Sequence, residues 1–382
     1  MRYPNEMERR NVGILGATGM VGQRFIQLLA NHPWFNITWL AASDRSAGKT
    51  YAEACKWKLD TPLPAHIAQM TLQPNMPELA TGELPRIIFA ALDADIAREL
   101  EPKFAAAGCA VISNSSAFRM THDVPLVVPE VNADHLGVLE RQATRSTSGS
   151  GGYIVTNPNC SAIGLVLALA PLQAAFGIDS LFVTTMQAVS GAGFPGVASL
   201  DILGNIVPYI KNEEEKMQEE VGKLLGSADP RGFHPLDAKV SAHCNRVPVI
   251  DGHTECVSIK LKTRATYEEI VAAWESFQPL SGKGHQGLHL PSAPLFPVEY
   301  APEEARPQPR LDLMRGNGMA TTVGRLRPCT LLDWKFVLLS HNTIRGAAGA
   351  AILNAEILAV LGKFDFRKWP SQQSEIAGAV PA

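Results

Sequence analysis

Cys160 stands out among the six cysteines of this 382-residue chain because of its sequence neighbours. It follows Asn-Pro-Asn at 157–159 and precedes an apolar run at 162–175, so we expect it at the first turn of a helix. Free N–H groups and the helix dipole at such a position lower the pKa of a thiol and stabilise an oxyanion. The sequence therefore predicts that Cys160 is a nucleophile that adds to a carbonyl group.

The other cysteines show no CxxC pair and no Cys/His ligand spacing. A disulfide framework and a zinc site are therefore not expected, and no metal is assigned. Most of these thiols are expected to be small buried hydrophobic residues.

His253 is the candidate that exchanges a proton with the adduct, since an imidazole titrates near neutral pH. Asp251 and Gly252 indicate a turn before it, so His253 should begin a strand at the edge of a cleft. Arg246 lies in an expected strand at 246–250 and could bind a carboxylate in the same site. Taken alone, each of these residues is also explained by a structural role.

The glycine-rich segment at 16–22, GATGMVG, directly follows a short apolar strand and precedes an amphipathic helix. Glycines let a backbone approach a pyrophosphate, and the helix N-terminus supplies N–H groups and positive potential. The spacing is GxxGxxG rather than GxGxxG, and a tight turn without ligand is the alternative. Its place at the first strand-to-helix turn favours a dinucleotide site.

The loop that ends the second strand, at 42–49, indicates which dinucleotide binds. Ser43, Arg45 and Ser46 could together hold a 2′-phosphate, through the guanidinium and the two hydroxyl groups. Asp44 is the type of residue that binds ribose hydroxyls in NAD sites, and the bland alternative is a polar loop. We favour NADP over NAD.

Alternating strands and helices in the first half predict a parallel sheet covered by helices on both faces. The expected strands are at 11–15, 37–42, 86–92, 110–114 and 126–128, with a helix at 93–108. A Ser/Gly-rich loop at 145–152 precedes the end of this unit near 153–157.

The second half has longer strands, and one of them alternates apolar with polar residues, which is typical of an antiparallel sheet with one wet face. Its expected elements are strands at 180–188, 246–250 and 254–261, a charged helix at 211–226, and a surface excursion at 282–309. A final Ala/Gly-rich helix at 345–361 is expected to return to the first unit, and the tail after Phe364 to be peripheral.

Composition excludes several classes of partner. A net charge of -3 gives no electrostatic reason to bind nucleic acid or an anionic membrane surface. No apolar run approaches the roughly 20 residues of a membrane span. The first ten residues are polar and charged, without the apolar core of a signal peptide. We expect a cytoplasmic protein with a small-molecule substrate.

Several motifs along the chain together resemble the aspartate-semialdehyde dehydrogenase family, in the branch found in archaea and fungi. They run in one order from about residue 11 to residue 362 and comprise GATGMVG, ASDRSAGK, SNSSAFRMTHDVPLVVPEVN, NPNC, QAVSGAG, RVPVIDGHTE and NTIRG. The resemblance implies an α/β fold: a Rossmann-type dinucleotide-binding domain plus an α+β domain like the C-terminal domain of glyceraldehyde-3-phosphate dehydrogenase. It implies a dinucleotide-binding domain at 1–156 joined by 342–382, and a catalytic and dimerisation domain at 157–341.

The activity implied by the resemblance is the reversible, phosphate-dependent oxidation of L-aspartate 4-semialdehyde to 4-phospho-L-aspartate with NADP, in biosynthesis of lysine, threonine, methionine and isoleucine. Cys160 resembles the family's nucleophile, His253 its acid/base and Gln187 the residue that orients the substrate. The residues that resemble substrate-binding positions are Arg246 for the α-carboxylate, Glu213 for the amino group, Arg119 and Lys216 for phosphate, and Asn159. The cofactor-binding positions are Gly16, Thr18, Gly19, Met20, Val21, Gly22, Ser43, Arg45, Ser46, Ser190, Gly191 and Asn342.

Three alternatives stay open at this point. An N-acetyl-γ-glutamyl-phosphate reductase uses a similar cofactor turn and cysteine on a longer, acetylated substrate, and a malonyl-CoA reductase exchanges phosphate for a thiol. Arg119 with Lys216 favours phosphate, and Glu213 favours a free amino group. A catalytically silent dinucleotide-binding regulator is the third. The family implies a homodimer or homotetramer, but the residues alone do not give the number of subunits.

Overall fold

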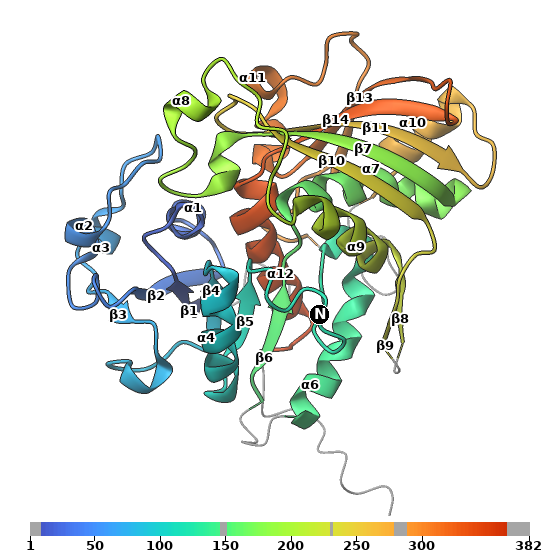
Figure 1. Ribbon diagram of the computed structural model, residues 1–382. Helices are drawn as coiled ribbons and strands as arrows, with labels where there is room; N and C mark the ends of the chain where they lie inside the picture. Colours follow the sequence, from blue (N-terminus) through green and yellow to red (C-terminus); the bar gives the residue numbers. More distant parts are fainter. Residues whose placement is uncertain (1–8, 146–150, 230–231, 279–288, 365–382) are drawn as a thin grey trace, which may run out of the picture.

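The computed structural model describes residues 9–145, 151–229, 232–278 and 289–364. Part of the loop expected at 145–152, part of the excursion expected at 282–309 and the whole tail after Phe364 lie outside these ranges. Two six-stranded sheets build the molecule, and Figure 1 shows the second sheet above the first with helices α7, α9 and α12 between and beside them.

The first sheet is parallel throughout and has the strand order β3-β2-β1-β4-β5-β6, the order of a dinucleotide-binding fold. Its strands are β1 (Arg10–Leu15), β2 (Phe35–Ala42), β3 (Gln73–Pro74), β4 (Ile87–Ala90), β5 (Ala110–Ser113) and β6 (Tyr153–Thr156). The central strands are apolar and buried on both faces, as expected of a parallel sheet that helices cover. The predicted α/β fold class is confirmed.

Helices cover both faces of this sheet. Residues of α1 and α12 pack with Val12 and Ile14 in one core, whereas Phe104 of α4 packs with Leu15 and Ile88 in another. The helices of this half are α1 (Met20–Leu29), α2 (Tyr51–Ala54), α3 (Ala65–Ala68), α4 (Ala94–Ala106), α5 (Pro129–Asn132) and α6 (Leu139–Arg145), with 3₁₀ turns η2 (Pro77–Leu79) and η3 (Ala133–Val138).

The strand predicted at 126–128 is wrong. The structure has a single bridge there, between Leu126 and Thr156. Pro125 and Pro129 flank the segment and lack the N–H groups that a longer ladder needs.

The second sheet has the order β10-β7-β11-β14-β13-β12 and is mixed rather than antiparallel. Its inner pairs are antiparallel, but β10 pairs with β7 and β12 pairs with β13 in parallel. Its strands are β7 (Ile178–Gln187), β10 (Lys239–Arg246), β11 (His253–Leu261), β12 (Val298–Ala301), β13 (Thr321–Pro328) and β14 (Trp334–Ser340). Strand β11 alternates buried and less buried residues, which confirms the predicted wet face.

Two further expectations for this half are wrong. No strand spans 246–250, because Arg246 is the last residue of β10 and Pro248 beyond it cannot donate to a ladder. Gly252, with φ 101°, then turns the chain. Residues 298–301 are not a surface excursion but the edge strand β12, whose Val298 and Ala301 are buried.

The remaining elements pack around this sheet. They are α7 (Cys160–Phe176), α8 (Ser199–Ile202), α9 (Glu213–Leu225), α10 (Tyr267–Glu275), α11 (Pro309–Asp312), the hairpin β8 (Ser227–Asp229) with β9 (Gly232–His234), the short turns η4 (Val189–Ala192) and η5 (Arg315–Gly318), the π-helical turn η6 (Ile344–Ala348), and α12 (Gly349–Val360). Helix α7 is apolar all round and lies in the second core, whereas α12 joins the core of the first sheet, as predicted. In the described residues no helix is long and apolar enough to cross a membrane.

Candidate active site

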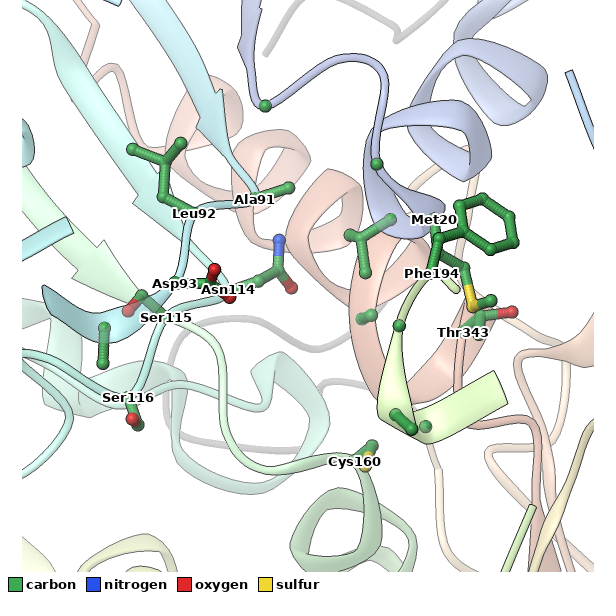
Figure 2. A pocket seen from close by; sticks show the side chains of 18 of the residues that line it. Met20, Ala91, Leu92, Asp93, Asn114, Ser115, Ser116, Cys160, Phe194 and Thr343 are labelled. Carbon is green, nitrogen blue, oxygen red and sulfur yellow. The ribbon is translucent and has the colours of Figure 1, made fainter. Parts of the chain in front are cut away.

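A cavity of about 600 Å³ lies between the glycine-rich turn and Cys160. Its wall is formed by the carboxyl ends of the parallel strands on one side and by α9, η4 and η6 on the other. Figure 2 shows Cys160 at the start of α7, with Ser115 and Ser116 on one side of the pocket and Phe194 on the other. Ligands of open parallel sheets bind at this edge of the strands.

Most residues predicted to bind the cofactor line this cavity. They are Gly16, Thr18, Gly19, Met20, Val21, Ser43, Ser190, Gly191 and Asn342. Asn342 also donates from Nδ2 to the Ser190 hydroxyl at 2.7 Å, and its Oδ1 accepts from the Gly252 N–H at 2.8 Å. A single amide thereby ties η4 to the turn that precedes His253.

Three predicted cofactor residues are not among the lining residues: Gly22, Arg45 and Ser46. At Gly22 a Cβ would lie 2.3 Å from the carbonyl oxygen of Gly16, so this glycine allows α1 to pack closely on the turn. Arg45 is exposed in a turn where the Ser46 N–H donates to the Ser43 carbonyl at 2.8 Å.

Cys160 is the first residue of α7, as predicted, and Asn159 is the N-cap. The Asn159 side-chain oxygen accepts from the N–H groups of Ser161 and Ala162 at 2.8 and 3.2 Å. Its amide nitrogen donates to Glu213 Oε1 at 2.7 Å. Asn159 therefore both caps the helix and connects it to α9.

His253 begins β11, as predicted, and its Nε2 lies 3.1 Å from Cys160 Sγ. Its other ring nitrogen, Nδ1, accepts a hydrogen bond from the Ala188 N–H at 3.1 Å. A ring nitrogen that accepts a hydrogen bond carries no proton. A neutral His253 therefore carries its proton on Nε2, where it points at the sulfur.

The charge states of this pair differ from the sequence expectation. Burial, with Glu213 adding to it, raises the pKa of Cys160 from 9.0 to about 12, against the opposing effect of Arg246. Burial, with Arg246 and His341 adding to it, lowers the pKa of His253 from 6.5 to about 3. The helix N-terminus predicted a lowered thiol pKa, but desolvation by burial outweighs it, so thiol and imidazole are neutral.

Glu213 contacts three of the residues predicted to act on the substrate, namely Asn159, Gln187 and Lys216. Its Oε1 accepts from Asn159 and, at 3.1 Å, from Gln187 Nε2, while its Oε2 lies 3.6 Å from Lys216 Nζ. Glu213 and Lys216 line the cavity, whereas Gln187 is buried behind it.

Arg246 is buried beside His253, where its Nη1 donates to the Ala188 carbonyl at 2.8 Å. A Cβ at Gly191 would lie 2.7 Å from Arg246 Nη1 and 3.1 Å from His253 Cε1. The missing side chain of Gly191 therefore gives a ligand in the cavity access to both residues.

Arg119 lines the cavity on the side of β5. Its Nη1 donates to Glu220 Oε1 at 2.9 Å and its Nη2 donates to the Asn114 carbonyl at 2.8 Å. At the end of the cavity opposite the glycine turn, the lining residues predicted to act on substrate are Cys160, Asn159, Arg119, Glu213 and Lys216. His253, Arg246 and Gln187 are buried and do not line it. Among the residues that the structure describes, no group of three or more His, Cys, Asp or Glu side chains is placed to hold a metal ion.

Two family models match most of the chain: the NAD-binding domain of semialdehyde dehydrogenases at residues 11–138 and their dimerisation domain at residues 169–345. The aspartate-semialdehyde dehydrogenase of Archaeoglobus fulgidus is 51% identical over 350 residues, which cover 92% of this chain and 98% of that protein. The Candida albicans enzyme of the same name is 48% identical over 364 residues, covering 92% and 98%. The chain belongs to the aspartate-semialdehyde dehydrogenase family.

Solved structures of aspartate-semialdehyde dehydrogenases agree with this result. The Candida albicans enzyme, crystallised with NADP, superposes with a TM-score of 0.84 at 45% identity and covers 93% of this chain and 100% of its own. Aspartate-semialdehyde dehydrogenase II of Vibrio cholerae, complexed with ASA, gives a TM-score of 0.71 at 26% identity, covering 92% and 99%.

The cavity of this family member also contains residues that sequence reasoning missed. The missed residues include Asn75, Ala91, Leu92, Asp93, Ala94, Ile96, Asn114, Ser115, Ser116, Phe194, Thr343, Gly346 and Ala347. Those at 91–94 and 114–116 directly follow β4 and β5, so the rule that ligands bind at the carboxyl ends of parallel strands was a usable signal for them. Phe194 and Gly346 had no such signal.

Proposed function

We propose that this protein catalyses the reversible, NADP-dependent, phosphorylating oxidation of L-aspartate 4-semialdehyde to 4-phospho-L-aspartate through a thioester on Cys160. The observation that carries the proposal is Cys160, which lines one end of a cavity whose other end is the glycine turn, with buried His253 Nε2 3.1 Å from its sulfur. Family membership supports the substrate, and the amino-acid biosynthetic role follows from it.

The cofactor end fits a dinucleotide phosphate. Helix α1 has Gly19 as its N-cap, no side-chain cap and no acidic residue in its first turn, so its N–H groups are available to a pyrophosphate. Gly16 has φ 73°, and a Cβ there would lie 2.4 Å from the Ala91 carbonyl oxygen. Ser43 lines the cavity and exposed Arg45 can reach a 2′-phosphate beside it. When bound, NADP accepts the hydride from the substrate.

At the substrate end, charge pairing presents the aldehyde to the thiol. We assign the α-carboxylate of the substrate to Arg246 and its ammonium group to Glu213. Asn159 and Gln187 hold the Glu213 carboxylate in place by hydrogen bonds. An ammonium group on Glu213 also offsets one of the two causes that raise the pKa of the Cys160 thiol. Substrate binding thereby favours loss of the thiol proton to solvent, which leaves the thiolate that attacks.

Thiolate addition produces a tetrahedral oxyanion, and the Nε2–H of neutral His253 is placed to donate a hydrogen bond to it. Accepting a proton at Nε2 would require the ring proton to be at Nδ1, where it would face the Ala188 N–H. In this conformation His253 therefore acts by stabilising the oxyanion, and its acid/base role requires the other ring tautomer. Arg119 and Lys216 are proposed to hold the phosphate that cleaves the thioester.

The decisive test is an assay of NADP reduction with phosphate present. Aspartate semialdehyde should be oxidised and N-acetylglutamate semialdehyde should not, and replacing phosphate by coenzyme A should abolish turnover. Cys160→Ala should remove thioester formation and activity together while leaving NADP binding intact. Ordinary turnover by Cys160→Ala would refute the scheme, and a preference for the acetylated aldehyde would overturn the substrate.

We further propose the division predicted from sequence: residues 1–156 with 342–382 as the dinucleotide-binding domain and 157–341 as the catalytic and dimerisation domain. The packing of α12 into the first core supports it for the described part of the closing segment. The dimerisation-domain match at 169–345 supports an oligomer, for which we propose a homodimer or homotetramer in the cytoplasm.

A further inference from the structure

Glu220 is a buried carboxylate, 2% exposed, that has no part in the chemistry proposed above. Each of its two oxygens accepts from a different partner. Oε1 accepts from Arg119 Nη1 at 2.9 Å, and Oε2 accepts from the backbone N–H of Asn159 at 2.6 Å. One side chain therefore joins the arginine assigned to phosphate to the residue before the nucleophile.

Both contacts restrict groups that would otherwise be free to move. A guanidinium has five donors in a rigid plane, and the bonds to Glu220 and to the Asn114 carbonyl fix that plane. Asn159 is the N-cap of α7, so its position sets that of Cys160. Because the two oxygens belong to one carboxylate, the separation between the Arg119 guanidinium and the start of α7 is held constant.

Helix α9 supplies this carboxylate from a polar face that continues beyond it. Glu213, Lys216, Glu220 and Lys223 follow at spacings of three and four residues, which places them on one side of the helix. Lys223 Nζ, also buried, donates to the carbonyls of Arg119, Thr121 and Val124 at 2.7, 3.0 and 2.9 Å. The same helix thus holds the side chain of Arg119 through Glu220 and its backbone through Lys223.

We propose that Glu220 is a positioning residue for the phosphate-dependent half of the reaction. It aims Arg119 at an anion that approaches the acyl group on Cys160, while leaving aldehyde binding and thioester formation to Arg246, Glu213 and His253. The inference rests on the proposed function, because it presumes a thioester that phosphate cleaves. This role predicts that a change at Glu220 affects cleavage of the thioester by phosphate but not formation of the thioester.

The test is Glu220→Gln, with Glu268→Gln as the control for loss of one carboxylate charge, because Glu268 is exposed on α10 and lines neither the cavity nor the pocket beside Arg119. A glutamine has one acceptor oxygen and an NH₂ group, whereas both partners of Glu220 are donors, so one of the two contacts is lost. We expect the KM for phosphate to rise on the order of tenfold, the size of effect found when a hydrogen bond that orients a metal ligand is removed. The pre-steady-state burst of NADPH should keep its amplitude and rate, and Glu268→Gln should match the parent in the burst and in the KM for phosphate.

An unchanged KM for phosphate, or a burst slowed as much as steady-state turnover, would overturn the inference. The second result would mean that Glu220 supports only the start of α7. If Glu220→Gln does not fold, Glu220→Asp serves in its place, because its shorter carboxylate reaches one partner at a time and the same split is expected. A parent protein that forms no NADPH from aspartate semialdehyde, in a burst or at steady state, would instead refute the proposed function.

Discussion

Glu213 has two effects on Cys160 that oppose each other. Its carboxylate holds Asn159, and through it the start of α7, yet its charge disfavours the thiolate. An ammonium group on Glu213 would remove the second effect and leave the first. Before substrate binds, the nucleophile would then be kept as the unreactive thiol, and the substrate itself would shift the thiol toward ionisation.

Glu213→Gln should therefore make the unliganded thiol more acidic. The amide keeps an acceptor oxygen for Asn159 but removes the charge that contributes to the raised pKa of Cys160. Alkylation by iodoacetamide, followed against pH without substrate, should show its inflection at lower pH and run several-fold faster at neutral pH. Glu215→Gln, an exposed neighbour with the same charge change, is the control. An inflection that stays in place or rises would contradict the role given to Glu213.

Glu101 is a second residue with a testable effect, in this case on stability rather than reactivity. It is fully buried on α4, where Oε1 accepts from the Ser113 hydroxyl at 2.6 Å and Oε2 has no partner. Burial raises its pKa from 4.5 to about 7. Between those values the folded protein binds the proton that the unfolded chain has lost, so stability falls as pH rises through this window.

At 1.36 kcal/mol per unit, the shift of Glu101 corresponds to a loss of at most about 3 kcal/mol between pH 4.5 and 7. Glu101→Gln should therefore be more stable than the parent at pH 8 and lose that advantage at pH 5, measured by urea midpoints. Glu99→Gln, on the exposed side of α4, should follow the parent at both values. Equal midpoint differences at the two pH values would show that Glu101 is ionised throughout.

Among the elements, the sequence predicted those whose ends are set by local backbone conformation and by the hydrophobic pattern. The glycine turn, the start of α7 at Cys160 and the start of β11 at His253 follow from local residue types, and all three are confirmed. The strands expected at 126–128 and 246–250 are wrong because proline removes ladder donors that an apolar run alone suggests.

What local sequence could not give is the set of contacts between distant elements. Glu220 lies 101 residues from Arg119 and 61 residues from Asn159 in the sequence. It belongs to a charged stretch that is also typical of a solvent-exposed helix face. The pKa of Cys160 was predicted in the wrong direction for the same reason, because its burial and the approach of Glu213 arise only on folding.

The π-helical turn η6 packs directly against the start of α7, so a larger side chain in this turn should move Cys160. A Cβ at Gly346 would lie 2.8 Å from Cys160 Cβ and 3.0 Å from its Cα. Gly346→Ala should therefore displace the nucleophile and lower kcat by at least tenfold, with a stability loss of about 1–3 kcal/mol from overpacking. Activity and a thermal scan on the same sample measure both.

Gly222→Ala on α9 is the matched control, because the nearest atom to its added Cβ would be Pro235 Cβ at 3.7 Å. An alanine in a helix interior costs less backbone entropy than a glycine, so this variant should be stabilised by about 0.4–1 kcal/mol and stay active. Equal activity in the two variants would mean that η6 does not constrain Cys160.

At the scale of the whole molecule, the closing segment returns to the first sheet and is fixed there by a buried ion pair. Arg345, in η6, donates from both terminal nitrogens to the two carboxylate oxygens of Glu130 at 2.7 Å each, and both side chains are fully buried. The partners are 215 residues apart. The pair therefore links α5 of the first half to the turn that contacts Cys160.

Removing one partner of this pair leaves the other charge buried without compensation. Glu130→Gln or Arg345→Met alone should therefore lower the free energy of unfolding by about 3–5 kcal/mol, whereas the double variant should recover much of that loss. Urea unfolding of all three variants gives the coupling energy of the cycle. Asp95→Asn, which breaks the exposed pair with Arg98, should change stability by less than about 1 kcal/mol. Additive losses in the double variant would show that the two charges do not depend on each other, and the closing segment would then be held by its other contacts, such as the apolar packing of α12 and the contact of Glu356 with His32.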